Sequence, residues 1–425
     1  MALLNYFVRW LAGKTYVLFL LSFSLTTQNA GADDNDTFNV TIGSTLMYDS
    51  NVFRLSPLIN PVTFLGRPER SDQIVTTTAT LNINKSYSLQ RFEFNGSIVD
   101  NRYSNFNFLN FIGKNYSAAW HWQLTPYFHG VLSSSRKEML NNFSALTGFV
   151  NSTNRNLRID ENHRFDGVFE VNRSLHLIGG VSQTVAQNTQ FTVQDFDNKV
   201  LSVEGGMRYT LPSNASLTYR VRSGQGDFFK RPFPIPSNLL DTRFNDLEHR
   251  LQLIWPLTAK TSINGRIGHF SRKHEHFPQR DFSGLIGGVD VNWGITGKTF
   301  LMASFSHEIA NLQTATNFQL PQFQRFSSSY VVTDRFSVMP IWQVSPHIIL
   351  RVRYEYITRK FGGEVIPLIF GNRSDTHHTG MVMLSWDPIK TISLSAMVQK
   401  DHRSSNLATY LYDDFTASVT ARLNF

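Results

Sequence analysis

The chain contains no cysteine among its 425 residues. This absence excludes a disulfide framework and thiolate catalysis, and it removes the risk of wrong crosslinks in an oxidising compartment. The sequence also lacks any apolar stretch of the roughly 20 residues that a membrane-spanning helix requires. Its mean hydropathy of −0.22 argues against a helical membrane protein. A membrane β-barrel is still allowed, because its strands are half polar and each gives only a weak hydrophobic signal.

The first 32 residues have the features of a secretory signal peptide. Arg9 and Lys14 supply positive charge, residues 16–25 form a short apolar run, and Ala30-Gly31-Ala32 provides a small-residue cleavage site. A retained membrane anchor is the alternative, but the apolar run is too short to span a bilayer. We expect residues 1–32 to be removed and residues 33–425 to form the mature domain. Loss of two basic residues leaves the chain with a positive net charge, which favours anions as partners.

The C-terminal residues alternate without a break between apolar and polar side chains. A period of two places successive side chains on opposite faces of a strand. In a chain with a secretion signal, such a strand ending in phenylalanine resembles the closing strand of a bacterial outer-membrane β-barrel. The apolar face consists of Phe415, Ala417, Val419, Ala421, Leu423 and Phe425.

Five of the seven tryptophans lie just before short turn sequences. Tryptophan favours the membrane interface, which accommodates both its apolar ring and its N–H group. Tryptophans in the core of a soluble β-sandwich are the alternative, but they would not be tied to turns. We predict one aromatic girdle at the periplasmic boundary, formed by Trp122, Trp255, Trp293, Trp342 and Trp386.

The whole mature chain can be divided into alternating segments of the length of barrel strands. Short and longer connections follow one another strictly, as in outer-membrane barrels with short periplasmic turns and long extracellular loops. We therefore predict an all-β fold: a transmembrane, antiparallel, up-and-down β-barrel of about 18 strands, with 16 possible, in the bacterial outer membrane. The last strand should pair with the first. The expected strands are 37–49, 72–85, 90–103, 115–124, 127–137, 157–171, 174–187, 199–211, 215–224, 243–255, 261–273, 282–293, 298–309, 329–342, 347–359, 376–386, 390–401 and 409–425.

Two residues do not fit the pattern well. Pro340 falls on the lipid-facing side and cannot donate to a ladder, so we expect a bulge or an early strand end there. His249 is in phase with Leu247, Leu251 and Leu253, which indicates either a tolerated neutral imidazole or a slip of register.

Arginines recur on the polar face of many strands. A charge on the lipid side would cost about 2–4 kcal/mol near the membrane midplane, so these arginines should face the lumen. Their forked donors match carboxylates, phosphates and sulfates, and a series of them could pass an acidic polymer. Alternatively, they pair with lumen acids such as Glu204 and Glu248 and stiffen the wall. The candidates for a polymer path are Arg164, Arg208, Arg220, Arg222, Arg250, Arg266, Arg351 and Arg353.

Two predicted extracellular loops, residues 225–242 and 310–328, are long and rich in phenylalanine. They could fold inward as a constriction whose rings stack on sugars, or the rings could pack against each other as a cap. The constriction candidates are Phe228, Phe229, Phe233, Phe318 and Phe323.

Two clusters at the predicted outer rim contain groups that could act in acid–base or metal chemistry. Neither has the spacing of a metalloprotease site, and no nucleophile motif accompanies them. We therefore expect no enzymatic activity and no cofactor. The clusters are His274, Glu275, His276 and Asp281, and Asp375, His377 and His378.

Several segments, taken in order, resemble the EpsL family of exosortase-associated exopolysaccharide biosynthesis proteins, from about residue 37 to the C-terminus. The resemblance implies an outer-membrane component that helps to export a capsular or extracellular polysaccharide, and it supplies no substrate-binding residues. The segments that carry it are Tyr48-Asp49-Ser50-Asn51-Val52-Phe53-Arg54, Gly113-Lys114-Asn115-Tyr116, Trp255-Pro256-Leu257-Thr258, Arg280-Asp281-Phe282-Ser283-Gly284, Ser329-Tyr330-Val331-Val332-Thr333-Asp334 and Asp401-His402-Arg403-Ser404-Ser405-Asn406.

Together these patterns predict a passive channel that exports a polysaccharide, acidic in nature, through a basic lumen. The expected partners are the lipid bilayer, the exopolysaccharide chain, periplasmic export and synthesis proteins, and the barrel-assembly machinery during insertion; nucleic acid is not one. A general or sugar-selective diffusion porin is the first alternative. An outer-membrane enzyme that acts at the rim is the alternative from another class.

Overall fold

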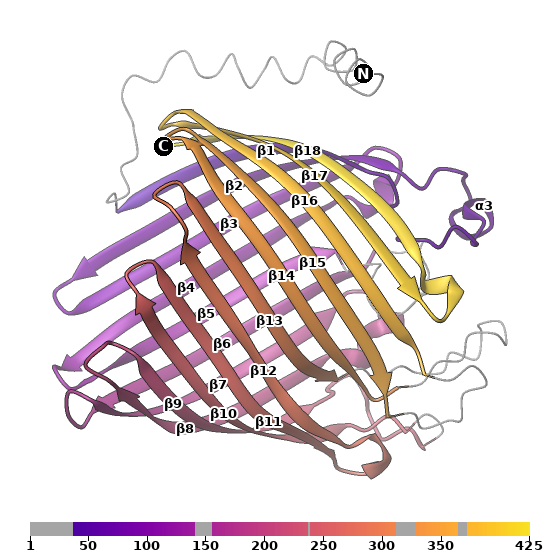
Figure 1. Cartoon of the computed structure of the whole chain (residues 1–425). Helices are drawn as coiled ribbons and strands as arrows, with labels where there is room; N and C mark the ends of the chain where they lie inside the picture. Colours follow the sequence, from indigo (N-terminus) through magenta and orange to yellow (C-terminus); the bar gives the residue numbers. More distant parts are fainter. Residues whose placement is uncertain (1–36, 141–154, 237–238, 312–327, 364–371) are drawn as a thin grey trace.

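The computed structural model describes residues 37–140, 155–236, 239–311, 328–363 and 372–425. Within these residues eighteen antiparallel strands form one closed sheet (Figure 1). Each strand pairs with its neighbours in the sequence, so the barrel is of the up-and-down type. The expected signal peptide lies outside the described residues. The strands are β1 (Phe38–Asp49), β2 (Asp72–Tyr87), β3 (Gln90–Tyr103), β4 (Phe111–Thr125), β5 (Phe128–Leu140), β6 (Leu157–Glu170), β7 (Leu175–Asn188), β8 (Asn198–Thr210), β9 (Ser216–Asp227), β10 (Arg243–Thr258), β11 (Thr261–His274), β12 (Phe282–Gly294), β13 (Thr299–Asn311), β14 (Tyr330–Ser345), β15 (Ile348–Gly362), β16 (Ser374–Ile389), β17 (Ile392–Ser405) and β18 (Tyr412–Asn424).

The barrel closes where the first strand meets the last. β1 pairs with β18 from Thr41 opposite Asn424 to Asp49 opposite Thr416. Beyond this ladder, the Phe425 N–H donates to the Val40 carbonyl at 2.8 Å, and the Val40 N–H donates back at 3.0 Å. The predicted closure is confirmed, and the count of eighteen replaces the alternative of sixteen.

The two faces of the sheet differ as a period of two requires. The outer face carries large apolar side chains that no other part of the described chain covers, among them Ile98, Phe165, Val203, Ile267 and Leu285. A surface this apolar is stable only against lipid. The inner face carries the polar and charged residues that are discussed below. None of the helices in the described residues is long and apolar enough to cross a membrane.

The two ends of the barrel also differ. Short turns join β2 to β3, β4 to β5 and each later pair in the same way, and we assign this end to the periplasm. Longer connections lie at the other end, where loop residues Val52, Phe53, Leu55, Phe106 and Leu109 form a small apolar core. This end also carries the helix α3 (Pro61–Leu65) and the 3₁₀ turns η2 (Asn107–Leu109), η3 (Phe191–Phe196), η5 (Pro278–Arg280) and η6 (Ala408–Tyr410).

Both irregularities expected from the sequence are resolved. β14 continues past Pro340, which pairs with Leu301 of β13, so the expected early end or bulge at Pro340 is wrong. The ladder to β15 lacks two pairs at that level but keeps its register on either side, and the register shift comes later, between Gln343 and Ser345. His249 does face outward, without a slip, and its Nδ1 lies 2.9 Å from the hydroxyl of Tyr219 on the neighbouring strand.

Candidate functional site: the lumen wall

The eight arginines predicted to line the lumen all lie on the inner face of the sheet. Strand alternation puts them there, because each one alternates with residues of the outer face, such as the exposed Phe165 beside Arg164 and Val352 beside Arg351. They come from β6, β8, β9, β10, β11 and β15. The lumen wall is therefore the place to look for the function of this barrel.

On β6 and β8, two carboxylates hold two of the arginines. Arg164 Nε lies 2.5 Å from Asp166 Oδ2, and Arg164 Nη2 lies 2.5 Å from Glu204 Oε1. The same glutamate oxygen accepts from Arg220 Nη1 of β9 at 3.0 Å. Glu204 thus joins three strands through charge-assisted hydrogen bonds, which are stronger than those between neutral groups.

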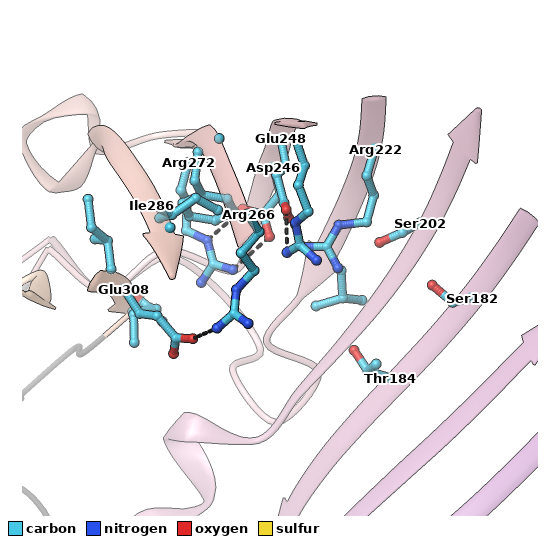
Figure 2. Close-up of a pocket in the computed structure, with 18 of the residues that line it drawn as sticks. Ser182, Thr184, Ser202, Arg222, Asp246, Glu248, Arg266, Arg272, Ile286 and Glu308 are labelled. Atoms are coloured by element: carbon cyan, nitrogen blue, oxygen red, sulfur yellow. Dashed lines mark hydrogen bonds and ion pairs between the residues drawn. The ribbon is translucent and has the colours of Figure 1, made fainter. Parts of the chain in front are cut away.

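A second carboxylate acts in the same way two strands further on. Glu248 of β10 is 4% exposed and forms ion pairs with both Arg222 of β9 and Arg250 of its own strand. Next to it, Arg272 of β11 makes two bonds of 2.7 Å to the carboxylate of Asp246. Figure 2 shows these side chains around one hollow of the lumen wall.

Arg266 of β11 extends this network across the next strand. Its guanidinium crosses the position of Gly288 on β12, and Nη2 lies 3.2 Å from Glu308 Oε1 on β13 (Figure 2). Asp290 is a weaker partner at 3.8 Å. Asp246 and Glu308 were not singled out from the sequence, although each lies in the polar phase of its strand.

The remaining three arginines have no acidic partner: Arg351 and Arg353 lie beside neutral groups, and Arg208 lies near another arginine, Arg220. Arg351 Nη1 donates to Ser385 Oγ at 3.0 Å, and Arg353 Nη2 lies 3.4 Å from Gln399 Oε1. Within the described residues no ion pair involves Arg208, Arg351 or Arg353. Five of the eight candidates therefore form ion pairs with lumen acids, with Arg222 and Arg250 sharing one glutamate, and three carry a positive charge without an acidic partner in the described residues.

The wall formed by β18 and β1–β5 differs in kind. Over the middle of these strands most inward residues are threonines, serines and asparagines, with small residues such as Gly43 and Ala119 among them, and the inward Arg422 of β18 lies opposite Gly43 toward the periplasmic end. Thr45 and Thr420 hydroxyls lie 2.8 Å apart, Thr41 donates to Asn424 at 3.0 Å, and Thr76 donates to Asn101 at 2.9 Å. In a closed ring of eighteen strands, β1–β4 lie across the lumen from β10–β13. The lumen thus has a charged side and a neutral, hydroxyl-rich side, which sequence reasoning missed although the same alternation encodes it.

The five tryptophans of the predicted girdle lie on the outer face near the periplasmic turns. Trp255, Trp293, Trp342 and Trp386 are 40–50% exposed. Trp122 is only 5% exposed, because its ring stacks on Phe165 at 5.6 Å between centroids and meets Phe128 edge-on at 4.9 Å. Four tryptophans are therefore exposed on the outer face near the short turns, and the fifth packs against the wall itself; their role as a membrane girdle stays a prediction.

The extracellular loop between β9 and β10 contains three of the five constriction candidates. Phe228 is 2% exposed and packs between the ring of Phe244, at 5.2 Å between centroids, and the guanidinium of Arg231, at 3.9 Å. Phe229 and Phe233 are 42% and 64% exposed. The burial of Phe228 favours packing over a constriction at that position. Phe318 and Phe323 lie outside the described residues.

The rim clusters do not converge on one point. His274 lies 3.3 Å from Asp281, whereas His276 pairs at 2.9 Å with Asp241 of the preceding loop. In the second cluster, His377 faces the lumen side and lies 3.5 Å from Asp401.

The neighbouring His378 of that second cluster points outward and bonds the Tyr354 hydroxyl at 2.9 Å. Among the described residues no group of three or more acidic or histidine side chains could hold a metal ion.

No protein-family model matches the chain, and no curated protein sequence is detectably similar to it. Solved structures do resemble it. OccK2 (OpdF) of Pseudomonas aeruginosa has a TM-score of 0.50 at 6% identity, with 91% of this chain and 98% of that chain covered. A BenF-like porin from Pseudomonas fluorescens Pf-5 has a TM-score of 0.48 at 10% identity, covering 92% and 98%. OccK1 (OpdK) of Pseudomonas aeruginosa has a TM-score of 0.46 at 10% identity, covering 91% and 99%.

The similarity to OccK2 shows a shared barrel fold, and it agrees with the apolar outer face and the polar lumen. The chain is a bacterial outer-membrane β-barrel. The predicted fold class and location are confirmed. The resemblance to the EpsL family stays a prediction.

Proposed function

We propose that this barrel is a passive diffusion channel for small, hydroxyl-rich anions, with carboxylated sugars as the solute class that fits best. The observation that carries the proposal is the pair of unlike walls in the lumen. Arg208, Arg351 and Arg353 offer cationic forks without an acidic partner in the described chain. The wall of β18 and β1–β5 offers hydroxyl and amide groups. A solute that carries one carboxylate and several hydroxyls can bind the arginines through its carboxylate and the hydroxyl-rich wall through its hydroxyls.

The distribution of acids favours a small solute over a polyanion. Asp166, Glu204, Glu248 and Glu308 are interspersed among the arginines of β6–β13. A long acidic chain stretched along this wall would meet carboxylates as often as guanidinium groups, and like charges repel. A single carboxylate can instead move between the arginines that lack acidic partners. For this reason the diffusion alternative accounts for the wall better than a continuous basic path does.

Export of an extracellular polysaccharide is the second candidate. The hydroxyl and amide wall supports it, since a row of neutral hydrogen-bonding groups suits a sugar polymer of low charge at many successive positions. The similarity of several segments to EpsL-type proteins supports it as well. In this case the polymer and periplasmic synthesis or export proteins would be the partners.

The first test uses purified protein in planar bilayers and in liposomes. For the intact channel we expect a reversal potential across a KCl gradient that indicates preference for chloride, and faster liposome swelling in glucuronate than in glucose. The triple variant Arg208→Gln, Arg351→Gln, Arg353→Gln should lose both preferences while it keeps its conductance. Arg102→Gln, which removes a charge from the outer face, is the matched control and should change neither.

An intact channel that prefers cations, or that passes glucose as fast as glucuronate, would exclude the proposal. The export candidate has its own assay, in which oligomers of a polyuronate and of a neutral glucan are compared as blockers of the current. If the acidic oligomer blocks no better than the neutral one, acidic polymer export fails. Loss of polymer secretion on deletion of the chain from its host would favour export over diffusion.

A further inference from the structure

Methionines gather on one part of the lumen wall. Five of the nine methionines of the chain lie on β13–β17, which are neighbours in the sheet (Figure 1). The register brings them close together, since Met302 lies opposite Met339 and Met383 lies opposite Met397. We call this group the methionine patch: Met302 of β13, Met339 of β14, Met381 and Met383 of β16, and Met397 of β17.

The methionine patch faces the lumen. Val382, between the two methionines of β16, and Val398, beside the methionine of β17, are exposed on the outer face, so the methionines point the other way. On β13 and β14 the outward positions next to the methionines are held by Leu301 and Pro340, which lie opposite each other. Met302 is 42% exposed, and the other four methionines are half-buried. All five side chains are therefore accessible from the lumen.

Two of the arginines that lack an acidic partner lie in the middle of the methionine patch. Arg353 lies opposite Met381, and Arg351 lies opposite Met383. This area differs from the wall of β6–β11, where acids pair with the arginines. These two arginines are the only charged residues in the segments that form the area, which are 300–304, 337–341, 349–353, 381–385 and 395–399.

The fold does not require methionine at these positions. On the next strand, β18, the inward positions are held by Ser418 and Thr420, and Ser418 lies directly opposite Met397. A polar side chain thus satisfies the strand alternation equally well. An apolar area that stays exposed to water usually marks a binding site. The methionine patch is therefore a candidate binding surface inside the lumen.

The chemistry of the area indicates what it can bind. Methionine has a flexible side chain and a polarisable sulfur that makes favourable contacts with aromatic rings. The guanidinium groups of Arg351 and Arg353 offer forked donors that match a carboxylate. A ligand that uses both kinds of group carries an aromatic ring and a carboxylate in one molecule.

The spacing of these groups sets the distance between the two parts of the ligand. Neighbouring strands lie about 4.8 Å apart, so Met383 and Met397 are about 5 and 10 Å from Arg351 along the wall. One sugar ring placed between a carboxylate and an aromatic group covers such a distance. The hydroxyl-rich wall begins at Ser418, next to Met397, and can take the hydroxyls of that sugar.

The two guanidinium groups are directed toward the strands that carry most of the methionines. Arg351 Nη1 donates to Ser385 Oγ of β16 at 3.0 Å, and Arg353 Nη2 lies 3.4 Å from Gln399 Oε1 of β17. Because these partners are neutral, they orient the arginines without cancelling their charge. A carboxylate bound there lies beside the methionines of β16 and β17.

From these observations we propose that the methionine patch binds the aromatic group of an aryl glycoside whose sugar carries a carboxylate, such as an aryl glucuronide. Arg351 and Arg353 bind the carboxylate, and the methionines bind the aromatic ring. The inference rests on the proposed function, because it takes a carboxylated sugar as the solute. It adds that an aromatic group on this sugar strengthens binding in the lumen.

The first test compares glucuronate, phenyl glucuronide and phenyl glucoside as blockers of the current in planar bilayers. Glucuronate lacks the aromatic ring, and phenyl glucoside lacks the carboxylate. For the intact channel we expect phenyl glucuronide to block at about tenfold lower concentration than glucuronate, as several thioether contacts to one ring provide. Phenyl glucoside should block more weakly than phenyl glucuronide.

Two double variants at the same positions separate the apolar surface from the fold. Met381→Gln, Met383→Gln keeps the length of the side chains but makes them polar, and it should abolish the difference between phenyl glucuronide and glucuronate. Met381→Leu, Met383→Leu keeps the area apolar and should retain part of the difference. The matched control is Val131→Gln, Ile178→Gln, which changes two half-buried inward residues of β5 and β7 and should have no effect.

A direct readout comes from NMR of isotope-labelled methionine methyl groups in detergent micelles. The ring current of a bound phenyl group shifts the resonances of nearby methyl groups. Phenyl glucuronide should shift the resonances of Met381, Met383 and Met397, and glucuronate should not. Met207 of β8 is 53% exposed on the outer face and serves as the internal control. The heat-dependent shift of folded barrels on gels checks that each variant is folded.

The outcomes distinguish this inference from the proposed function. Equal blocking by phenyl glucuronide and glucuronate would overturn the inference alone, provided that liposomes still swell faster in glucuronate than in glucose. A difference that persists in Met381→Gln, Met383→Gln, without shifts of the methionine resonances, would also overturn it, because the ring would then bind elsewhere. Blocking by phenyl glucoside as strong as that by phenyl glucuronide would show that the carboxylate has no part, and it would refute both proposals.

Discussion

Arg220 of β9 lies directly opposite Arg250 of β10 on the lumen side of the wall. Like charges in this position destabilise a sheet by a few tenths of a kcal/mol to about 1 kcal/mol. Each arginine is held by a different glutamate, Arg220 by Glu204 and Arg250 by Glu248. The two glutamates therefore stabilise the wall. At the same time, their negative charges reduce the attraction of these arginines for anionic solutes in the lumen.

The first prediction follows from that double role. In Glu248→Gln, the charges of Arg222 and Arg250 lose their partner and become available to anions. The reversal potential across a KCl gradient should shift toward the equilibrium potential of chloride. The ratio of anion to cation permeability should rise at least about twofold, because a lumen wall with charges of one sign concentrates counter-ions. The free energy of unfolding should fall by about 1 kcal/mol, because both arginines are partly exposed and their ion pairs are screened.

The matched control for this change is Asp227→Asn, which removes a carboxylate paired with Arg243 on the outer face. It should leave the reversal potential unaltered. An equal shift in both variants would show that total charge, and not the lumen wall, sets the selectivity.

All eighteen strands could be predicted from the sequence, because lipid on one side and water on the other impose the same alternation on every strand. The inward phase of the arginines follows from that alternation alone. Their partners do not follow from it. Arg266 reaches Glu308 two strands away only because Gly288 leaves the intervening strand without a side chain. Such contacts depend on the stagger of the strands, which no single segment encodes.

The second prediction concerns how Trp122 packs on the wall. Its ring lies against Gly130 of β5, at a place where a Cβ would collide with the ring and with the carbonyl of Asp166. Gly130→Ala should therefore displace Trp122 from Phe165 and lower the free energy of unfolding by about 1–3 kcal/mol, the usual cost of overpacking. Urea unfolding followed by tryptophan fluorescence measures the loss.

Gly205→Ala is the control for the same measurement, since nothing lies within 4 Å of the position of its Cβ. Both glycines lie within strands and face outward, Gly130 near the start of β5 and Gly205 in the middle of β8, so each variant adds one methyl group to the outer face. Equal stabilities of the two variants would mean that Trp122 can move at no cost.

The third prediction concerns a buried ion pair at the outer rim. Arg373 and Asp375 side chains are each 1% exposed, their atoms lie 2.6 Å apart, and the guanidinium is 3.6 Å from the ring centroid of Tyr410. Asp375→Asn leaves a buried cation without its counter-charge. The free energy of unfolding should fall by about 3–5 kcal/mol, as is typical when one member of a buried pair is removed.

Asp100→Asn provides the comparison, because Asp100 pairs with Arg102 on the outer face with side chains 35% and 56% exposed. Its cost should not exceed about 1 kcal/mol. Similar losses for the two variants, measured by urea unfolding in detergent, would contradict the assignment of Asp375 to a buried pair.

The contacts between the loops at the outer rim could not be predicted from the sequence. The sequence places His274, Glu275, His276 and Asp281 close together, and this proximity suggests one cluster. In the structure His276 pairs instead with Asp241, which is 35 residues earlier and belongs to another loop. Loop contacts of this kind depend on where the ends of neighbouring strands lie relative to one another. The spacing of residues along the chain does not determine these positions.

The fourth prediction is a pH dependence of this loop contact. The hydrogen bond that the His276 ring donates to Asp241 raises the pKa of His276 above 6.5, and the carboxylate also attracts the imidazolium. Burial raises the pKa of Asp241, but hydrogen bonds from the His276 side chain and backbone outweigh it, and the pKa is lowered below 3.8. The contribution of His276 to stability is therefore complete below pH 6.5 and is lost as the pH rises through its raised pKa. That of Asp241 is complete above pH 3.8 and is lost as the pH falls through its lowered pKa.

The contact between His276 and Asp241 should thus be strongest between pH 3.8 and pH 6.5, and it should weaken as the pH rises through the pKa of His276. The backbone N–H groups of His276 and Phe277 donate to Asp241 Oδ2 at 2.6 and 3.1 Å, so their hydrogen exchange reports on it. After correction for the intrinsic effect of pH, protection in the native protein should decrease as the pH rises above 6.5 and passes through the raised pKa of His276. In His276→Gln the decrease should be absent, while His347→Gln, a change in a periplasmic turn, should behave as the native protein does. A decrease that persists in His276→Gln would assign the pH dependence to another group.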